Sequence, residues 1–409
     1  MRSLLTTGLV VMATVLGALA VVPTASAAPA STAIPAHTAI PATSKIAAQV
    51  FTQLNDTSCL MPGECVAVGQ HYNGKAPIPV SDTWNGSKWT GVSVPAPSGA
   101  SSGFFTSVSC WTTGCLAVGS YTHGSTGYGL SESFNGTKWT AGHQPATVSG
   151  ASQVVLESVA CPATSYCIAD GYYVPSSNKN VEQAIAEVWS GGVWRAYRAS
   201  PPEPYSNLDT ISCPTAKYCV LGGLYLTSAG SFVLAEAYDG VHWRALNVAQ
   251  PTAPNAHVQF INGVSCSSTT SCAAVGVSVN KSAHATAFAE VLSGGAWRYR
   301  IITWQTGQQS SLNAVSCTTT KFCIAVGGNG PFATLTNGKA AFAIWNGSTW
   351  QQHIAPAPPA GQGNVLFGVK CVSTTYCVLT GSQGKANTNT GVGLGGVLNG
   401  TTWTWHTTS

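Results

Sequence analysis

Fourteen cysteines are the residues of this chain whose spacing points most directly to chemistry. They form seven pairs of one design, with the two partners five or six positions apart. The pairs are Cys59 with Cys65, Cys110 with Cys115, Cys161 with Cys167, Cys213 with Cys219, Cys266 with Cys272, Cys317 with Cys323, and Cys371 with Cys377. Zinc usually takes four ligands, and each pair offers two thiols with no histidine at fixed spacing. No basic residue regularly accompanies the pairs to lower a thiol pKa for redox catalysis. Seven disulfides formed in an oxidising compartment are therefore expected.

A second set of polar residues stands four positions before the first cysteine of each pair. The set comprises Asn55, Thr106, Glu157, Asp209, Asn262 and Asn313, with Phe367 in the seventh place. If this segment is the innermost strand of its unit, the set surrounds a channel mouth. It would then line a water-filled tunnel or bind a ligand. Glu157 and Asp209 fall in adjacent units, where their oxygens could bind calcium or act as a catalytic pair in a glycoside hydrolase or polysaccharide lyase.

A third, acidic set recurs near the end of five units. Its members are Asp82, Glu132, Glu187, Glu236 and Glu290. Catalysis by paired carboxylates requires unlike environments, which five symmetric copies do not offer. We expect these acids to make structural hydrogen bonds to a neighbouring strand.

The elements that position these residues repeat with the cysteines. Successive first cysteines are about 50 residues apart, a period typical of propeller blades. In the fourth unit, alternating or β-branched segments and turn signals predict strands at 208–213, 219–225, 232–238 and 242–248. The prediction is an all-β fold, a seven-bladed β-propeller with four antiparallel strands per blade. Each blade would be continuous in sequence, and closure would rest on packing between the first and last blades, helped by residues 40–50.

Two further residue types recur at the same position of every unit and support the repeat; we call each such set a column. A glycine stands four residues after each second cysteine, at Gly69, Gly119, Gly171, Gly223, Gly276, Gly327 and Gly381. A glycine within a strand marks a bulge or a close backbone approach. A tryptophan follows the last turn of each unit, at Trp89, Trp139, Trp194, Trp243, Trp297, Trp350 and Trp403. We expect these indoles to pack one blade against the next.

The motifs carry a resemblance to known repeat proteins. Leu221-Gly222-Gly223, followed by Tyr238-Asp239-Gly240 and Trp243, resembles a kelch repeat. Ser58-Cys59 followed by Cys65-Val66-Ala67-Val68-Gly69 resembles secreted bacterial repeat proteins with Ser-Cys, a short gap and Cys-x-Ala-Val-Gly. The resemblance covers about residues 50–409 and implies a kelch or galactose-oxidase-like seven-bladed propeller. It carries no reaction, because the copper ligands and the Tyr-Cys crosslink of galactose oxidase have no evident counterpart here.

The segments before the repeats predict export. Residues 1–27 have the basic start, apolar run and small-residue cleavage site of a signal peptide. Residues 28–48 are an Ala/Pro/Thr-rich tether, and residues 49–409 are the propeller. We expect a secreted, extracellular protein with no membrane span after signal removal.

The amino-acid composition argues against some classes of binding partner. Charged residues make up 7% of the chain, the net charge is +4, and there are no basic runs, so nucleic acid is excluded as a partner. The long loops that join the second to the third strand and one blade to the next share one face, here named the variable-loop face. Tyr172, Tyr205 and Trp304 are candidate ligand-binding residues in these loops. We predict a non-catalytic monomer without a cofactor that binds glycan, cell-wall material or an exported protein there.

Overall fold

A computed structural model describes residues 50–141, 144–198, 205–250, 256–302, 304, 308–330, 338–358, 363–384 and 390–408. The signal peptide and the tether expected at 1–27 and 28–48 lie outside the described residues. The regular structure in the described ranges is entirely β-strand. Within these ranges, no helix is long and apolar enough to cross a membrane.

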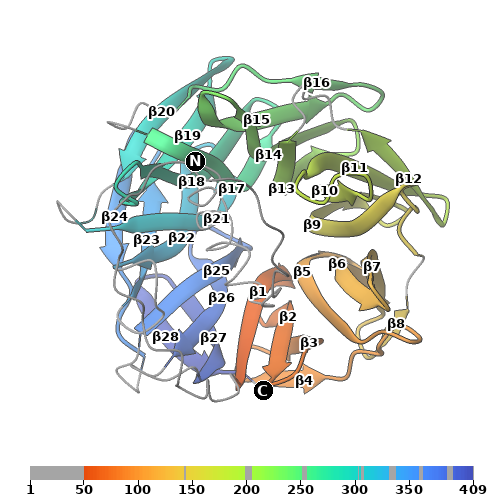
Figure 1. Cartoon of the computed structure of the whole chain (residues 1–409). Coiled ribbons are helices and arrows are strands. Elements are labelled where there is room, and N and C mark those ends of the chain that lie inside the picture. The colour runs from red at the N-terminus through yellow and green to blue at the C-terminus, as the bar shows by residue number, and fades with distance from the viewer. Residues whose placement is uncertain are drawn as a thin grey trace, which may run out of the picture.

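The strands form seven blades of four, arranged as a ring (Figure 1). The first strand of each blade lies at the centre of the ring. These inner strands are β1 Val50–Met61, β5 Ser102–Trp111, β9 Ala151–Ala163, β13 Tyr205–Thr215, β17 Ala256–Ser268, β21 Ser310–Thr319 and β25 Gly363–Cys371. The second strands are β2 Glu64–Asn73, β6 Gly114–His123, β10 Tyr166–Pro175, β14 Tyr218–Thr227, β18 Ser271–Asn280, β22 Phe322–Asn329 and β26 Tyr376–Gly384.

The third and fourth strands extend each blade outward to the rim. The third strands are β3 Pro77–Trp84, β7 Thr126–Phe134, β11 Gln183–Ser190, β15 Gly230–Tyr238, β19 Ala285–Ser293, β23 Lys339–Trp345 and β27 Thr390–Asn399. The fourth are β4 Trp89–Val92, β8 Trp139–Ala141, β12 Val193–Arg198, β16 Trp243–Ala245, β20 Ala296–Ile302, β24 Trp350–Ile354 and β28 Thr402–Thr407. Consecutive strands within each blade pair antiparallel, which confirms the predicted architecture.

The ring closes through backbone pairing between the first and last blades. The start of β1 runs parallel to β27, with Val50 opposite Thr390 and Phe51 opposite Gly391. This pairing joins the two blades into one eight-stranded sheet, while the other five blades are separate four-stranded sheets. Closure therefore adds main-chain hydrogen bonding to the side-chain packing that the sequence predicted.

Every inner strand contains a β-bulge at the same place. The register skips one residue on each inner strand, namely Asn55, Thr106, Glu157, Asp209, Asn262, Asn313 and Phe367. The residue just before each bulge pairs with the recurring glycine of the second strand, as Leu54 does with Gly69. A Cβ atom on any of the seven glycines would lie 1.9–2.1 Å from a carbonyl oxygen of the inner strand. Both a bulge and a close approach thus explain the glycine column.

Apolar residues form cores between blades. In one core, Val66 and Val68 of the first blade pack with Phe105, Val108 and Trp139 of the second. Tryptophans of the same column occupy the equivalent cores around the ring, at Trp89, Trp194, Trp297, Trp350 and Trp403. The expected blade-to-blade packing of these indoles is confirmed.

All seven expected disulfides are formed, and each links the inner strand of a blade to its second strand. In five blades the bonded cysteines are direct cross-strand partners: Cys59 and Cys65, Cys110 and Cys115, Cys266 and Cys272, Cys317 and Cys323, and Cys371 and Cys377. In the third and fourth blades the bonds join Cys161 to Cys167 and Cys213 to Cys219, at a second irregularity of the strand register. The predicted pairing is confirmed at every position, and none of the described cysteines is free.

The serine before the first cysteine has a separate role. In five blades its hydroxyl accepts a hydrogen bond from the backbone N–H of the first cysteine in the next blade. The donor–acceptor pairs are Cys110–Ser58, Cys161–Ser109, Cys266–Ser212, Cys317–Ser265 and Cys371–Ser316. The Ser-Cys motif therefore connects neighbouring blades as well as the strands within each blade.

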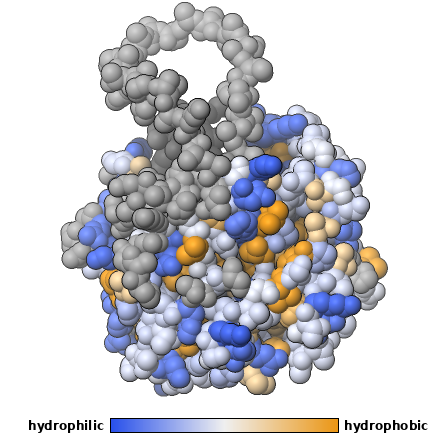
Figure 2. Space-filling view, turned by 90° about the horizontal axis from the view of Figure 1, so that it is seen from below, coloured by the Kyte–Doolittle hydropathy of each residue, from blue (hydrophilic) through white to orange (hydrophobic). Residues whose placement is uncertain are grey.

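The outer surface reflects the low charge content. Figure 2, which is turned by 90° from the view of Figure 1, shows hydrophilic and intermediate residues over most of the described surface that faces the viewer, with hydrophobic residues in smaller groups. Hydrogen-bonding side chains rather than ion pairs are therefore the main polar groups available to a partner.

Candidate binding sites

Most of the polar side chains at the bulges form hydrogen bonds to the next blade. In four blades the bulge side chain donates a hydrogen bond to a backbone carbonyl of the next blade. The donor–acceptor pairs are Asn55 to Phe105 at 2.6 Å, Thr106 to Leu156 at 2.6 Å, Asn262 to Leu312 at 2.7 Å and Asn313 to Leu366 at 2.7 Å. Each of these bonds therefore joins the bulge of one blade to the backbone of the next. This role explains the polar column without a ligand at these four positions.

Glu157 and Asp209 break this pattern. By the same register, the carbonyls they face belong to Leu208 and Ile261, and a carboxyl group can donate a hydrogen bond to them only while it is protonated. Both acids are half-buried, and no side-chain hydrogen bond to either is found within the described part of the chain. The blades that carry them, the third and fourth, are therefore chemically distinct from the rest of the ring.

A third acid, which the sequence analysis missed, lies beside them. Asp170 on β10 is fully buried, and neither of its carboxyl oxygens has a hydrogen-bond partner of good geometry. It points into the seam between the third and fourth blades, because Ile168 on the same face of β10 packs against Leu208 and Ile211. The sequence carried a signal for it: Cys167-Ile168-Ala169-Asp170-Gly171 has aspartate where the Cys-x-Ala-Val-Gly pattern has valine.

Two tyrosines and a fourth acid complete the group. The Tyr205 hydroxyl at the start of β13 donates a hydrogen bond to Glu182 Oε2 at 2.8 Å. Tyr172 lies on β10 two residues beyond Asp170, and so on the same strand face. The charges of Glu157, Glu182 and Asp209 all act on its hydroxyl. We name these six residues the acid-tyrosine cluster: Glu157, Asp170, Tyr172, Glu182, Tyr205 and Asp209.

Burial and repulsion between the acids raise the pKa values of the carboxyl groups in the cluster, which favours their protonated form. Burial raises the pKa of Glu157 to about 7, and the charge of Glu182 adds to the shift. Burial also raises the pKa of Glu182 to about 7, although the Tyr205 hydroxyl opposes this. The pKa values of Asp170 and Asp209 are raised well above their ordinary range by burial and then by the neighbouring acids; nearby backbone N–H groups oppose the shift only at Asp170. The net shifts all favour the neutral carboxyl group.

The structure brings together four of the candidate residues, Glu157, Asp209, Tyr172 and Tyr205. It does not bring Trp304 to them. The indole N–H of Trp304 donates to the His353 carbonyl at 2.8 Å, on the outermost strand of the sixth blade. Among the described residues, no three histidine, cysteine or acidic side chains are grouped so that they could hold a metal ion, so calcium at Glu157 and Asp209 stays a prediction.

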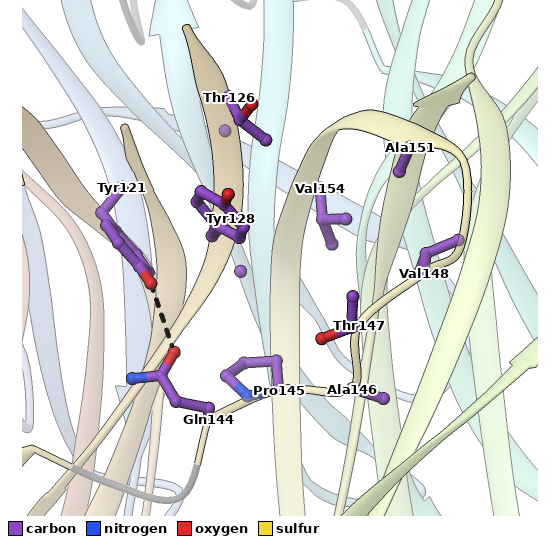
Figure 3. Close-up of a pocket in the computed structure, with 12 residues that line it drawn as sticks. Tyr121, Thr126, Tyr128, Gln144, Pro145, Ala146, Thr147, Val148, Ala151 and Val154 are labelled. Carbon is purple, nitrogen blue, oxygen red and sulfur yellow. Dashed lines mark hydrogen bonds between the residues drawn. The ribbon is translucent and has the colours of Figure 1, made fainter. Parts of the chain in front are cut away.

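A separate pocket of about 270 Å³ lies between the second and third blades, on the variable-loop face (Figure 3). The rings of Tyr121 and Tyr128 stack with centroids 5.4 Å apart and planes 25° apart. The Tyr121 hydroxyl donates to Gln144 Oε1 at 3.5 Å. Gln144 and Thr147 come from the linker between the blades, so three strands (β6, β7 and β9) and one linker build the wall. The sequence analysis did not find this pocket.

Two of the recurring acids of the third strands accept hydrogen bonds from blade linkers. Glu187 Oε2 accepts from the Ala146 N–H at 2.8 Å, and Glu290 Oε2 accepts from the Ala249 N–H at 3.1 Å. Their role is structural as predicted, but the partner is the linker leading into the blade rather than a neighbouring strand. Glu132 differs, because both of its fully buried oxygens lack a partner and burial raises its pKa to about 8.

Comparison with solved structures supports the fold. The β-propeller domain of the trilobed protease from Pyrococcus furiosus matches with a TM-score of 0.51 at 8% identity, covering 87% of this chain and 97% of that one. A polysaccharide lyase, the PL25 ulvan lyase, matches with a TM-score of 0.51 at 9% identity over 73% and 81% of the two chains. At such identities the likeness concerns the fold alone. No protein-family model and no curated protein matches the chain.

The findings together describe a β-propeller with one disulfide in each of seven blades. Seven intramolecular disulfides, with no free cysteine among the described residues, point to an oxidising environment.

Proposed function

We propose that this protein is a secreted, non-catalytic propeller that binds a glycan through its variable-loop face. The observation that carries the proposal is the pocket at the stacked pair Tyr121 and Tyr128. Aromatic rings present flat apolar faces to the C–H side of a sugar, and Tyr128 is 40% exposed, so its ring is accessible. Gln144, Thr126 and Thr147 add amide and hydroxyl groups that can exchange hydrogen bonds with sugar hydroxyls.

The surrounding surface suits a neutral or weakly charged saccharide. Charged residues are scarce in the chain, and the pocket lining contains no charged side chain. Specificity would then rest on hydrogen-bond geometry and ring stacking rather than on ion pairing.

The test is a glycan array followed by titration calorimetry of the best ligand against Tyr128→Ala. The expected result is a loss of affinity of about tenfold or more, corresponding to about 1–2 kcal/mol. Tyr225→Ala is the matched control, because Tyr225 stacks on Phe232 at 5.5 Å and 25° in the fourth blade without lining this pocket. Absence of any glycan ligand, or equal losses in both variants, would reject the proposal.

Hydrolysis or lysis of polysaccharide at Glu157 and Asp209 is the weaker candidate. A carboxylate pair in such enzymes works because its environments push the two pKa values apart. Here the pKa values of both acids shift in the same direction, toward the neutral form. Polysaccharide cleavage that disappears in Glu157→Gln and in Asp209→Asn would restore this candidate.

A further inference from the structure

We infer that the acid-tyrosine cluster is a second binding site, which takes a primary ammonium group such as that of a lysine side chain or an amino sugar. This inference does not depend on the tyrosine pocket, which lies at the neighbouring seam between the second and third blades.

The first argument is the uncompensated charge. The cluster gathers four carboxyl groups, and no lysine, arginine or histidine forms an ion pair with any of them within the described part of the chain. A buried carboxylate without a partner is costly, so the cluster holds protons instead. A cation that enters it replaces those protons as the compensating charge.

The second argument is Asp170. It is fully buried, both its oxygens lack hydrogen-bond partners of good geometry, and the charges of Asp209 and Glu157 act on it. Buried acceptors of this kind are rare in folded proteins unless something outside the chain satisfies them. An ammonium group carries three donors and no acceptor, which suits a site made of carboxyl oxygens.

The third argument concerns Glu157 and Asp209. Four other blades place a donor at the bulge to satisfy a carbonyl of the next blade. With acids at the bulge of the third and fourth blades, the chain has this donor only while the carboxyl group is protonated, and it loses the donor on ionisation. An ammonium group beside Glu157 supplies donors for the carboxylate and for a backbone carbonyl at once.

The cluster suits an organic cation better than a metal ion. Among the described residues, no three histidine, cysteine or acidic side chains are placed so that they could hold a metal ion. Tyr172 and Tyr205 add two aromatic rings, which attract an ammonium group through their faces. Because Tyr205 donates its proton to Glu182, its hydroxyl oxygen remains an acceptor for the ligand.

Binding should release protons. The ammonium group favours ionised carboxylates, whereas burial raises the pKa values of Glu157 and Glu182 to about 7. Affinity should therefore rise as the pH increases from about 5 to about 8, while a lysine amine remains charged throughout.

Titration calorimetry on the folded, disulfide-bonded protein tests the inference with two matched ligand pairs. One pair is tetralysine and its fully Nε-acetylated form, and the other is the glucosamine tetramer and its N-acetylated form. Acetylation removes the charge and keeps the scaffold, and the two pairs distinguish a peptide source of the amine from a saccharide source. Calcium chloride is titrated alongside.

The expected result is that at least one amine binds about tenfold or more tightly than its acetylated form. Its affinity should fall about tenfold in Glu157→Gln and stay unchanged in Glu132→Gln, which removes a buried acid of another blade. Tyr128→Ala should leave amine binding intact. The inference is overturned if both acetylated ligands bind as tightly as the amines, if Glu157→Gln binds as the unaltered protein does, or if calcium binds and both amines do not.

Discussion

A Cβ atom on Gly223 would lie 2.0 Å from the carbonyl oxygen of Asn207 on the adjacent strand β13. The two residues flank the bulge at Asp209, where Leu208 pairs with Gly223 and Thr210 pairs with Gly222. The bulge thus requires glycine on the facing strand, and it directs the Asp209 side chain out of the regular ladder. The lack of a side chain at Gly223 on β14 therefore allows the bulge on β13 that positions Asp209, a member of the acid-tyrosine cluster.

Gly223→Ala should therefore destabilise the protein strongly. The added methyl collides with backbone rather than with a flexible side chain, so we expect a loss of about 3 kcal/mol or more in the free energy of unfolding. Urea unfolding followed by tryptophan fluorescence measures it. Gly338→Ala is the control, since its Cβ would meet only one atom, at an ordinary 3.6 Å. Similar stabilities of the two variants would contradict the bulge explanation.

The bulge hydrogen bond of Asn313 predicts that alanine and aspartate at this position reduce stability by different amounts, and that only the effect of aspartate depends on pH. Asn313→Ala removes the donor to the Leu366 carbonyl and should cost about 1–2 kcal/mol. Asn313→Asp keeps the shape but places a carboxylate beside that carbonyl at neutral pH, so it should cost more than alanine there and regain stability in acid. Denaturant midpoints at about pH 4 and about pH 8 separate the two effects. Equal, pH-independent losses would show that only packing matters.

Stability should fall as the pH rises, and Glu132 should contribute. Its pKa is raised from 4.5 to about 8 in the folded protein, so the folded state holds a proton that the unfolded chain releases. That contribution is complete below about pH 4.5 and is lost as the pH rises through about 8. Glu132→Gln stays neutral, so its melting temperature should vary less with pH and exceed that of the unaltered protein by about 1–3 °C near pH 9. Scanning fluorimetry across this range checks it, with the exposed Glu64→Gln as the control that should show no such change.

Ring closure should depend on Gly395 of β27. A Cβ atom there would lie 2.2 Å from Trp89 Nε1, in the core that joins the last blade to the first. Gly395→Val should displace the indole and cost about 2–4 kcal/mol. Trp89→Phe provides a smaller ring and should recover part of the loss in the double variant, measured as a double-mutant cycle of unfolding free energies. Additive effects of the two substitutions would mean that they do not share this contact.

The fold could be predicted from the sequence because it is built from seven copies of one unit. The seven cysteine pairs, the glycine column and the tryptophan column each occur once per unit, so every local signal is confirmed by six others. The disulfide pairing, the bulge glycines and the indole packing follow from contacts between residues close in sequence or in the adjacent unit. Such contacts repeat with the period and can be predicted from it.

The site was decided by contacts that do not repeat. The sequence shows Glu157 and Asp209 as acids at equivalent positions of adjacent units. Whether their neighbours are hydrogen-bond donors or further acids depends on how β10 of the third blade packs against β13 of the fourth. Asp170 and Glu182 lie 13 and 25 positions beyond Glu157 in sequence. Strand pairing within the third blade places Asp170 beside the bulge at Glu157, and packing of the third blade against the fourth adds Tyr205 and Asp209. The sequence alone determined the ring, because each blade must bury both faces against its neighbours. The tertiary structure alone decided which irregular side chains share one seam, because burial and repulsion there depend on distances that no period encodes.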